Sequence, residues 1–221
     1  MQIKIMQNIL AANERKANEL RSLLKEKKIL MVNLISSPGS GKTTLLEKTI
    51  PLLQAKNYRV AVIEGDVETD RDAQRLMAYG IPVILITTSG ACHLESVSIE
   101  KAFESLNLDE LDIIFVENVG NLVCPAEFDI GEDAKVALLS TPEGDDKVAK
   151  YPLLFQEASL VILNKVDLLA FIPFKESYFE EDLKQINPQV AVIKMAAQQD
   201  MGLEEWIDWL REMVSRKHRT D

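Results

Sequence analysis

Cysteine is scarce in this sequence: 221 residues contain two, at the distant positions 92 and 124. Long apolar runs are also missing, since no stretch reaches the roughly 18 to 20 residues that a membrane span needs. The first residues, 1–5, carry no extended apolar segment of the kind that directs secretion. We therefore expect a cytoplasmic protein that has no disulfide and no membrane as a partner.

Dense basic clusters are missing as well. The chain has 25 basic and 35 acidic residues, a formal net charge of −10, and its short basic run at 216–219 suits the negative end of a helix dipole. Nucleic acid is therefore a poor partner for the body of the protein. With 47% hydrophobic residues the chain can bury a full core, and one domain is the default expectation.

Short runs rich in Val, Ile and Leu alternate with helical patterns along most of the chain. This alternation is typical of an α/β fold, in which helices cover both faces of a mainly parallel sheet. Pro51 is expected to kink the helix that follows the first strand. The runs expected as strands are 29–35, 59–63, 83–86, 113–116, 136–139, 160–163 and 190–193.

Two amphipathic helices are expected at the ends of the chain. Apolar residues recur at helical spacing over 5–26 and again over 202–217. The predicted organisation is an N-terminal helix at 1–28, one α/β domain at 29–217 and a tail at 218–221.

A phosphate-loop motif follows the first apolar run. Residues 36–43 read Ser-Ser-Pro-Gly-Ser-Gly-Lys-Thr and lead into a helical pattern, which is the strand–loop–helix setting that such a loop requires. Two glycines let backbone N–H groups turn towards phosphates, Lys42 bridges the terminal phosphates as a catalytic group, and Thr43 offers its hydroxyl to Mg²⁺. Ser36 replaces the first glycine of the signature, and most turn conformations tolerate serine. The residues assigned to phosphate binding are Gly39, Ser40, Gly41, Lys42, Thr43 and Thr44.

A second motif, Asn164-Lys165-Val166-Asp167, follows another apolar run and predicts the base. The Asp167 carboxylate can accept hydrogen bonds from N1 and N2 of guanine at once, and adenine offers no such pair. Asn164, Lys165 and Asp167 are therefore assigned to the base. The domain is predicted to be a P-loop GTPase domain that converts GTP to GDP and phosphate.

Acidic residues follow two further strands at the same expected edge of the sheet. An acidic group beside a phosphate loop can hold the water shell of Mg²⁺ or position the attacking water, and we assign these catalytic and magnesium-binding roles to Asp66 and Glu117. Which of the two contacts Mg²⁺ stays open. Gly120 can offer its N–H to the γ-phosphate, and Asp70 and Asp72 are expected to be helix N-caps.

Both cysteines and one of the two histidines fall in loops expected at this edge. Cys92 and His93 come after the strand at 83–86, and Cys124 comes soon after Gly120. Thiolate and imidazole are the ligands that nickel, zinc and similar divalent ions favour. We expect a metal site here, against the alternative of half-buried structural thiols.

Three ligands per chain leave a tetrahedral shell incomplete. A two-fold homodimer that pairs these loops would supply the remainder, because an isologous contact duplicates each residue. Cys124 lies four residues after Gly120, so a terminal phosphate could reposition a metal ligand through one short loop.

At these positions the sequence resembles the HypB family, the nickel-inserting GTPases of NiFe-hydrogenase maturation. The likeness extends from about residue 30 to 215. It rests on Glu64-Gly65-Asp66, Thr69-Asp70-Arg71-Asp72-Ala73, Gly90-Ala91-Cys92-His93-Leu94, the run from Glu117 to Phe128, and Asn164-Lys165-Val166-Asp167.

The resemblance implies a dimerising P-loop GTPase of the SIMIBI class with slow GTP hydrolysis. It implies a nickel or zinc site made by Cys92, His93 and Cys124 at the dimer interface. It also implies delivery of nickel to the hydrogenase large subunit, together with a small zinc-containing accessory protein.

Two further features depart from the family pattern. Residues 1–28 contain neither the Cys-rich motif of some members nor the His-rich stretch of others, so storage of many ions is not expected. Where the family commonly has a Ser-Ala pair for the base, this chain has Met195-Ala196-Ala197-Gln198, which leaves the backbone N–H of Ala197 for that contact.

Three alternatives remain open. The first is a GTPase for another metalloenzyme, of the urease-accessory or cobalamin-mutase type, although the urease type typically has Cys-Pro-His and here Ala126 follows Cys124-Pro125. The second is a P-loop kinase, which would not need the motif at 164–167. The third is a plain metal buffer, which would bind metal independently of nucleotide.

Overall fold

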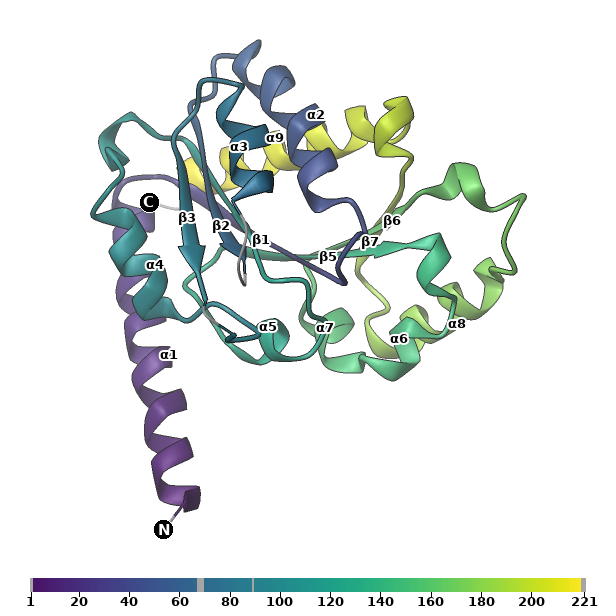
Figure 1. Ribbon diagram of the computed structural model, residues 1–221, viewed down its shortest axis with the longest axis horizontal. Helices are drawn as coiled ribbons and strands as arrows, with labels where there is room; N and C mark the ends of the chain where they lie inside the picture. Colours follow the sequence, from purple (N-terminus) through teal and green to yellow (C-terminus); the bar gives the residue numbers. More distant parts are fainter. Residues whose placement is uncertain (1, 67–69, 89, 220–221) are drawn as a thin grey trace.

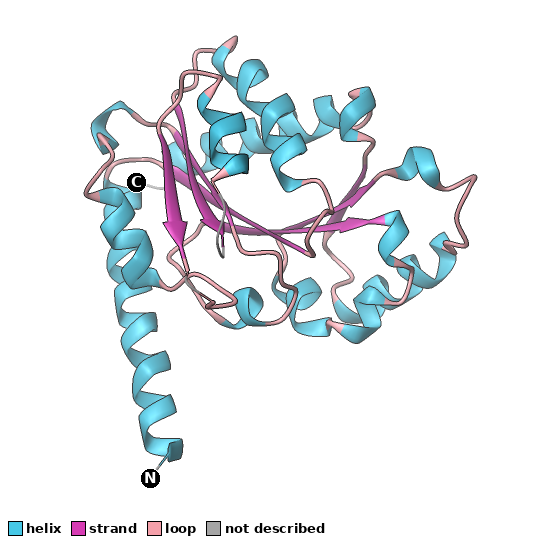
Figure 2. Ribbon diagram, in the orientation of Figure 1, coloured by secondary structure: helices cyan, strands magenta, loops and turns pink. Residues whose placement is uncertain are grey.

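Seven parallel strands form one sheet at the centre of the computed structural model, which describes residues 2–66, 70–88 and 90–219 (Figures 1 and 2). The strand order is β3-β2-β4-β1-β5-β6-β7. The α/β prediction is confirmed, and each predicted strand is present with ends shifted by at most three residues. The strands are β1 (Leu30–Ser36), β2 (Val60–Asp66), β3 (Val83–Thr87), β4 (Ile113–Glu117), β5 (Ala134–Ser140), β6 (Leu160–Asn164) and β7 (Ala191–Lys194).

Helices cover both faces of this sheet (Figure 1). One face is covered by α2 (Lys42–Gln54), α3 (Arg71–Met77) and α9 (Leu203–Arg219). The other is covered by α1 (Gln2–Glu26), α4 (Ser96–Phe103), α5 (Cys124–Glu127), α6 (Lys147–Lys150), α7 (Pro152–Glu157) and α8 (Glu176–Ile186). Both terminal helices were predicted correctly.

One detail of the predicted organisation changes. Helix α9 continues through Arg219, so two of the four residues expected to be a tail are helical. The remaining tail residues, 220–221, and Thr69 of the family motif lie outside the described residues. Pro51 lies inside α2, which continues to Gln54.

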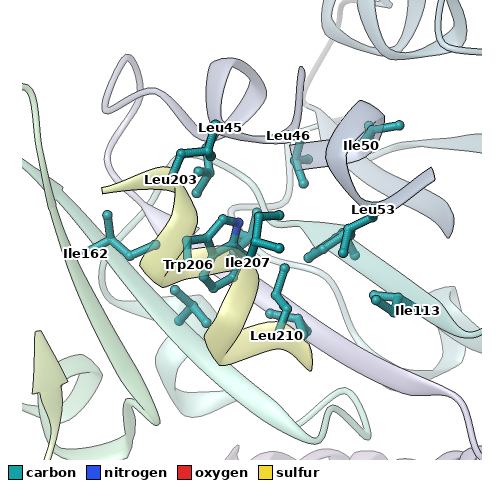
Figure 3. Packing of buried hydrophobic residues seen from close by; sticks show 14 of the residues in the cluster. Leu45, Leu46, Ile50, Leu53, Ile113, Ile162, Leu203, Trp206, Ile207 and Leu210 are labelled. Carbon is teal, nitrogen blue, oxygen red and sulfur yellow. The ribbon is translucent and has the colours of Figure 1, made fainter. Parts of the chain in front are cut away.

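The core under α2 and α9 is built around Trp206. This side chain is fully buried, and its Nε1 donates a hydrogen bond of 2.9 Å to Thr49 Oγ1. Figure 3 shows it surrounded by apolar side chains of α2, α9 and the sheet. This packing fixes α2, and with it the loop that precedes α2, against the strands.

Helix α1 is attached to the opposite face by specific polar contacts. Asn13 Nδ2 donates to the Asp129 carbonyl at 2.7 Å, and Arg21 donates to both carboxylate oxygens of Asp129 at 2.6 and 2.7 Å. The N-terminal end of α1 extends beyond the rest of the fold (Figure 1). Among the described residues, no helix combines the length and apolar character that crossing a membrane requires.

Gly131 allows the close approach of α1 and provides a test of it. Its φ is +86°, and a Cβ there would come within 2.8 Å of the Ala17 carbonyl oxygen and 2.9 Å of Leu20 Cβ. We expect Gly131→Ala to lower the free energy of unfolding by roughly 2–4 kcal/mol, because backbone strain and overpacking add. Urea denaturation measures the change.

Gly80→Ala is the matched control. Gly80 has a similar φ of +69° but open space around the site of a Cβ. It should cost about 1 kcal/mol, from backbone strain alone. Equal effects of the two substitutions would show that the contact with α1 contributes nothing.

Candidate functional site

A cleft of about 380 Å³ lies where the loops after β1, β2 and β4 meet. The carboxyl ends of these parallel strands lie side by side, which is why loops distant in sequence converge there. The cleft is lined by Pro38, Gly39, Gly41, Lys42, Thr43, Thr44, Glu64, Gly65, Asp66, Asp72, Arg75, Glu117, Asn118, Val119 and Gly120. Of the residues assigned to phosphate, catalysis or magnesium, only Ser40 is not part of this lining.

The loop between β1 and α2 depends on its two glycines. Gly39 has a φ of +75° and Gly41 a φ of +104°. A Cβ on Gly41 would also meet Asn164 Nδ2 at 2.6 Å. Ser36 is buried at the end of β1 and is not among the described residues with positive φ, so no glycine is needed there. Its Oγ accepts a hydrogen bond of 3.0 Å from Lys42 Nζ.

Ser40 faces away from the cleft lining and contacts the segment after β5. Its Oγ lies 2.7 Å from Glu143 Oε1 and 2.8 Å from the Ser37 carbonyl, and its single hydrogen can go to one of them. Glu143 also accepts from the Ser140 backbone N–H at 2.7 Å. The phosphate loop is therefore connected to β5 as well as to β1.

Charged side chains are buried at the base of the cleft. Thr43 Oγ1 donates a hydrogen bond of 2.8 Å to Glu117 Oε1, and Glu117 Oε2 has no partner among the described residues. Burial lowers the pKa of Lys42, although nearby carboxylates, with Glu117 foremost, oppose the shift. Burial also raises the pKa of Glu117. A divalent cation beside Thr43 and Glu117 would satisfy these oxygens.

Glu64 is a cleft residue to which the sequence analysis gave no role. It pairs in register with Glu117 across β2 and β4, is 3% exposed, and its Oε2 has no partner among the described residues. Burial, followed by the negative charges of Glu117 and Asp72, raises its pKa to about 8. The sequence did carry a signal that could have placed Glu64 in the cleft. It lies two residues before Asp66, and alternate residues of a strand share a face.

Of the two aspartates expected to cap a helix, only one lies at an N-cap position. Asp70 occupies the N-cap position of α3, although its side chain makes no capping hydrogen bond there. Asp72 was predicted wrongly: it lies in the first turn of α3, pairs with Arg75 at 2.7 Å and lines the cleft. A run with several aspartates does not fix which one precedes the first helical turn.

A second cleft of about 280 Å³ adjoins the first and shares Gly41 and Thr44 with it. Its other lining residues are Asn164, Lys165, Asp167, Leu168, Ala197 and Gln198, which include every residue assigned to the base. The loop after β6 is joined to the phosphate loop, because Asn164 Nδ2 donates to the Ser40 carbonyl at 2.9 Å and Lys165 Nζ to the Gly39 carbonyl at 2.7 Å.

The acceptor and donor expected to meet the base already have partners. Asp167 is exposed and accepts a hydrogen bond of 3.2 Å from Gln199 Nε2. The Ala197 backbone N–H donates to Asn164 Oδ1 at 3.2 Å. Both contacts are long, so a base that offers shorter ones can replace or share them.

Cys92, His93 and Cys124 come together near the same edge of the sheet. Their ligand atoms all lie within 4.8 Å of one another, with 2.9 Å between the two sulfurs and 3.6 Å between Cys92 Sγ and His93 Nδ1. His93 Nε2 is buried and has no hydrogen-bond partner among the described residues. Cys92 is exposed and Cys124 partly so, which leaves both sulfurs open to an ion or a second molecule.

The segment after β4 supports this cluster. Asn121 Nδ2 donates to the Cys92 carbonyl at 3.1 Å, and the ring of Phe128 packs against His93 with centroids 3.8 Å apart. Hydrogen bonding to Cys124, followed by burial, raises the pKa of Cys92. A bound cation would favour the thiolate instead.

Comparison with known proteins agrees with this geometry. Residues 30–194 match the family model described as CobW/HypB/UreG, nucleotide-binding domain. The hydrogenase maturation factor HypB of Azotobacter chroococcum mcd 1 is 46% identical over 217 residues, which are 98% of this chain and 71% of the relative. The hydrogenase/urease maturation factor HypB of Helicobacter hepaticus is 41% identical over 222 residues, which are 99% of this chain and 90% of the relative.

A solved structure is similar over nearly the same range. The crystal structure of HypB from Helicobacter pylori in complex with nickel superposes with a TM-score of 0.88 at 39% sequence identity. The match covers 93% of this chain and 96% of that one.

Glu64 provides a test of the charge crowding in the cleft. In chelator, without nucleotide and near pH 7, we expect Glu64→Gln to raise the free energy of unfolding by about 1–3 kcal/mol. With a pKa of about 8 in the fold, Glu64 must take up a proton when the chain folds, whereas the amide needs none and can donate to a neighbouring carboxylate. Magnesium-dependent nucleotide binding should weaken in the same variant. Denaturant unfolding and nucleotide titration with and without Mg²⁺ measure the two effects.

The exposed Glu104 supplies the control. Glu104→Gln should change stability by less than about 0.5 kcal/mol. A Glu64→Gln variant that is no more stable than the original chain would show that the crowding of carboxyl groups in the cleft does not destabilise the fold.

Proposed function

The chain belongs to the HypB group of the CobW/HypB/UreG family, and we propose that it hydrolyses GTP and delivers nickel during maturation of the NiFe-hydrogenase large subunit, through nucleotide-dependent dimerisation. One observation carries the proposal. The segment that starts with Asn118 lines the phosphate cleft, and six residues later it supplies Cys124 to the thiol–imidazole cluster.

The nucleotide in this proposal is GTP. The phosphates bind to the loop at 39–44, and the guanine base binds beside Asn164, Lys165 and Asp167. The exposed carboxylate of Asp167 accepts from N1 and N2 of guanine, and the Ala197 N–H donates to the base carbonyl. The two adjoining clefts support this arrangement, since they share Gly41 and Thr44.

Hydrolysis in this proposal depends on the buried charges of the phosphate cleft. Thr43, Glu117 and Asp66 would hold Mg²⁺, which would neutralise charge on the phosphate oxygens. Lys42 stabilises the charge on the terminal phosphate, and the Asp66 and Glu117 carboxylates position the attacking water. The Gly120 N–H donates to the γ-phosphate. The hydrogen bond between Thr43 and Glu117 supports the pairing of these two residues around a cation.

Nickel is the cargo in this proposal, held by Cys92, His93 and Cys124. The donor set suits nickel and zinc alike, and the similar Helicobacter pylori protein was solved in complex with nickel. Three ligands and exposed sulfurs support a homodimer in which the partner completes the site. The expected partners are a small zinc-containing nickel accessory protein and the hydrogenase large subunit.

A second acceptor has specific support. The similar Helicobacter hepaticus protein is described as a maturation factor for hydrogenase and urease, so delivery to urease is the alternative. Transfer of nickel from the loaded protein to purified apo-hydrogenase or apo-urease, measured as regained activity, distinguishes the two acceptors.

Asp167→Asn tests the identity of the base. An amide in place of the carboxylate turns one acceptor into a donor, so GTP affinity should fall on the order of a hundredfold while xanthosine triphosphate binds more tightly. Asp200→Asn is the control, because Asp200 pairs with Lys48 outside the lining of the base cleft. Unchanged GTP affinity in Asp167→Asn would contradict the proposal.

His93→Ala tests the metal site against His218→Ala. His218 is the second histidine and lies near the end of α9. Its Nε2 is 3.2 Å from the Lys28 carbonyl oxygen. Only His93→Ala should lose nickel binding, by about tenfold or more, together with nickel-linked dimerisation. Cys92→Ala and Cys124→Ala should lose both completely.

Competition with a chromophoric chelator measures affinity, and light scattering measures oligomer size. Nickel affinity that is equal in His93→Ala and His218→Ala would remove His93 from the ligand set.

A further inference from the structure

An asparagine occupies the middle of β1, a strand that is buried at every residue. Asn33 is 0% exposed in β1, whose other residues up to Ile35 are apolar. Its neighbours on the same face, Met31 and Ile35, belong to two separate apolar clusters. An amide buried at such a boundary destabilises a fold unless its donor and acceptor both have partners.

Both groups of the Asn33 amide are hydrogen-bonded, and both partners are buried. Asn118 Nδ2 donates to Asn33 Oδ1 at 3.1 Å, and Asn33 Nδ2 donates to Glu132 Oε1 at 3.2 Å. Asn118 is 1% exposed and Glu132 is 7% exposed. Each is also joined to its own loop, because Asn118 Oδ1 accepts from the Val119 N–H at 3.0 Å and Glu132 Oε2 from the Ile130 N–H at 2.8 Å.

These contacts join the two ends of one functional segment. Residue 118 follows β4 directly, and residue 132 lies two residues before β5. Between them lie Gly120, Asn121, Cys124 and Phe128, through which the segment lines the phosphate cleft and contacts or supplies all three ligands of the thiol–imidazole cluster.

The phosphate loop touches the first end of this segment. A Cβ on Gly120 would meet Pro38 Cγ at 2.7 Å and Pro38 Cα at 3.0 Å. The other end reaches the helix that carries Cys124, since Lys135 lies 4.0 Å from Glu132 and donates to the Ala126 carbonyl at 2.9 Å. A shift at Gly120 therefore has a route to α5 through hydrogen bonds and one ion pair.

We propose that Asn33 is the positioning residue that couples the occupancy of the phosphate cleft to the affinity of the metal site, by holding Asn118 and Glu132 together. The inference rests on the proposed nucleotide and nickel functions. The rigid centre of the sheet carries the coupling, so residues 119–131 move between two arrangements as one unit.

An amide suits this position. Asn33 accepts from an amide and donates to a carboxylate at the same time, whereas aspartate cannot donate and leucine can do neither. If Asn33 were merely structural, replacing it would lower stability without changing how nucleotide affects metal affinity.

The experiment compares nickel affinity with saturating GDP and with a non-hydrolysable GTP analogue in the full chain. In the original chain, the nickel affinities measured with the two nucleotides should differ by at least about fivefold. In Asn33→Leu the ratio should fall to within about twofold of one, while both nucleotides still bind. An unchanged ratio in Asn33→Leu overturns the inference and leaves the proposed function intact.

Thr49→Val is the matched control. It removes a buried hydrogen-bonding group on the opposite face of the sheet, where Thr49 accepts from Trp206, and it should lower stability without changing the ratio. Loss of coupling in Thr49→Val as well would overturn the inference, because any buried polar loss would then have the same effect.

Glu132→Gln serves where Asn33→Leu does not fold. It keeps the shape of the side chain but cannot accept from both Asn33 and Ile130, so it too should bring the ratio towards one. Hydrogen exchange of residues 121–131 gives a readout without metal: the GTP analogue should change the exchange of this segment in the original chain and not in Glu132→Gln. An original chain that binds both ligands with a ratio of one, or equal exchange changes in the two proteins, overturns the inference.

Discussion

The position of β1 between β4 and β5 is the constraint on which both sites depend. Because all three strands are parallel, the phosphate loop leaves β1 at the same edge where Glu117 ends β4 and where Ser140 ends β5. The segment 118–132 connects these two neighbours, and its Gly120 lies against Pro38 of the phosphate loop. Residues that line the phosphate cleft and one thiol of the thiol–imidazole cluster therefore share one short stretch of chain.

The phosphate cleft buries ionisable side chains of both signs. Lys42, Glu64 and Glu117 are each less than a tenth exposed, and two carboxylate oxygens among them lack partners in the described part of the chain. Such groups are costly to bury without compensation, and they interact strongly with any cation or phosphate that enters. A ligand that supplied the missing contacts would therefore stabilise the folded chain.

The metal cluster has the opposite character. Its sulfurs are accessible, its three ligands come from two loops, and the supporting contacts from Asn121 and Phe128 fix backbone and ring while leaving the sulfurs accessible. This suits a site that must receive and release its ion, because a closed four-ligand shell within one chain would hold the ion as a structural element. The buried Asn33 connects these two contrasting sites through the sheet.

Local sequence patterns located the strands, the two terminal helices and most residues that line the two clefts. Apolar runs of β type located each of the seven described strands within three residues, and the motif at 36–43, between an apolar run and a helical pattern, located the phosphate loop. Such features depend on neighbours in the chain. The buried pairing of Glu64 with Glu117, the place of Asp72 in the cleft lining and the hydrogen bonds of Asn33 depend on the tertiary structure. Their surroundings come from other strands, and strand order and register depend on the packing of the whole sheet.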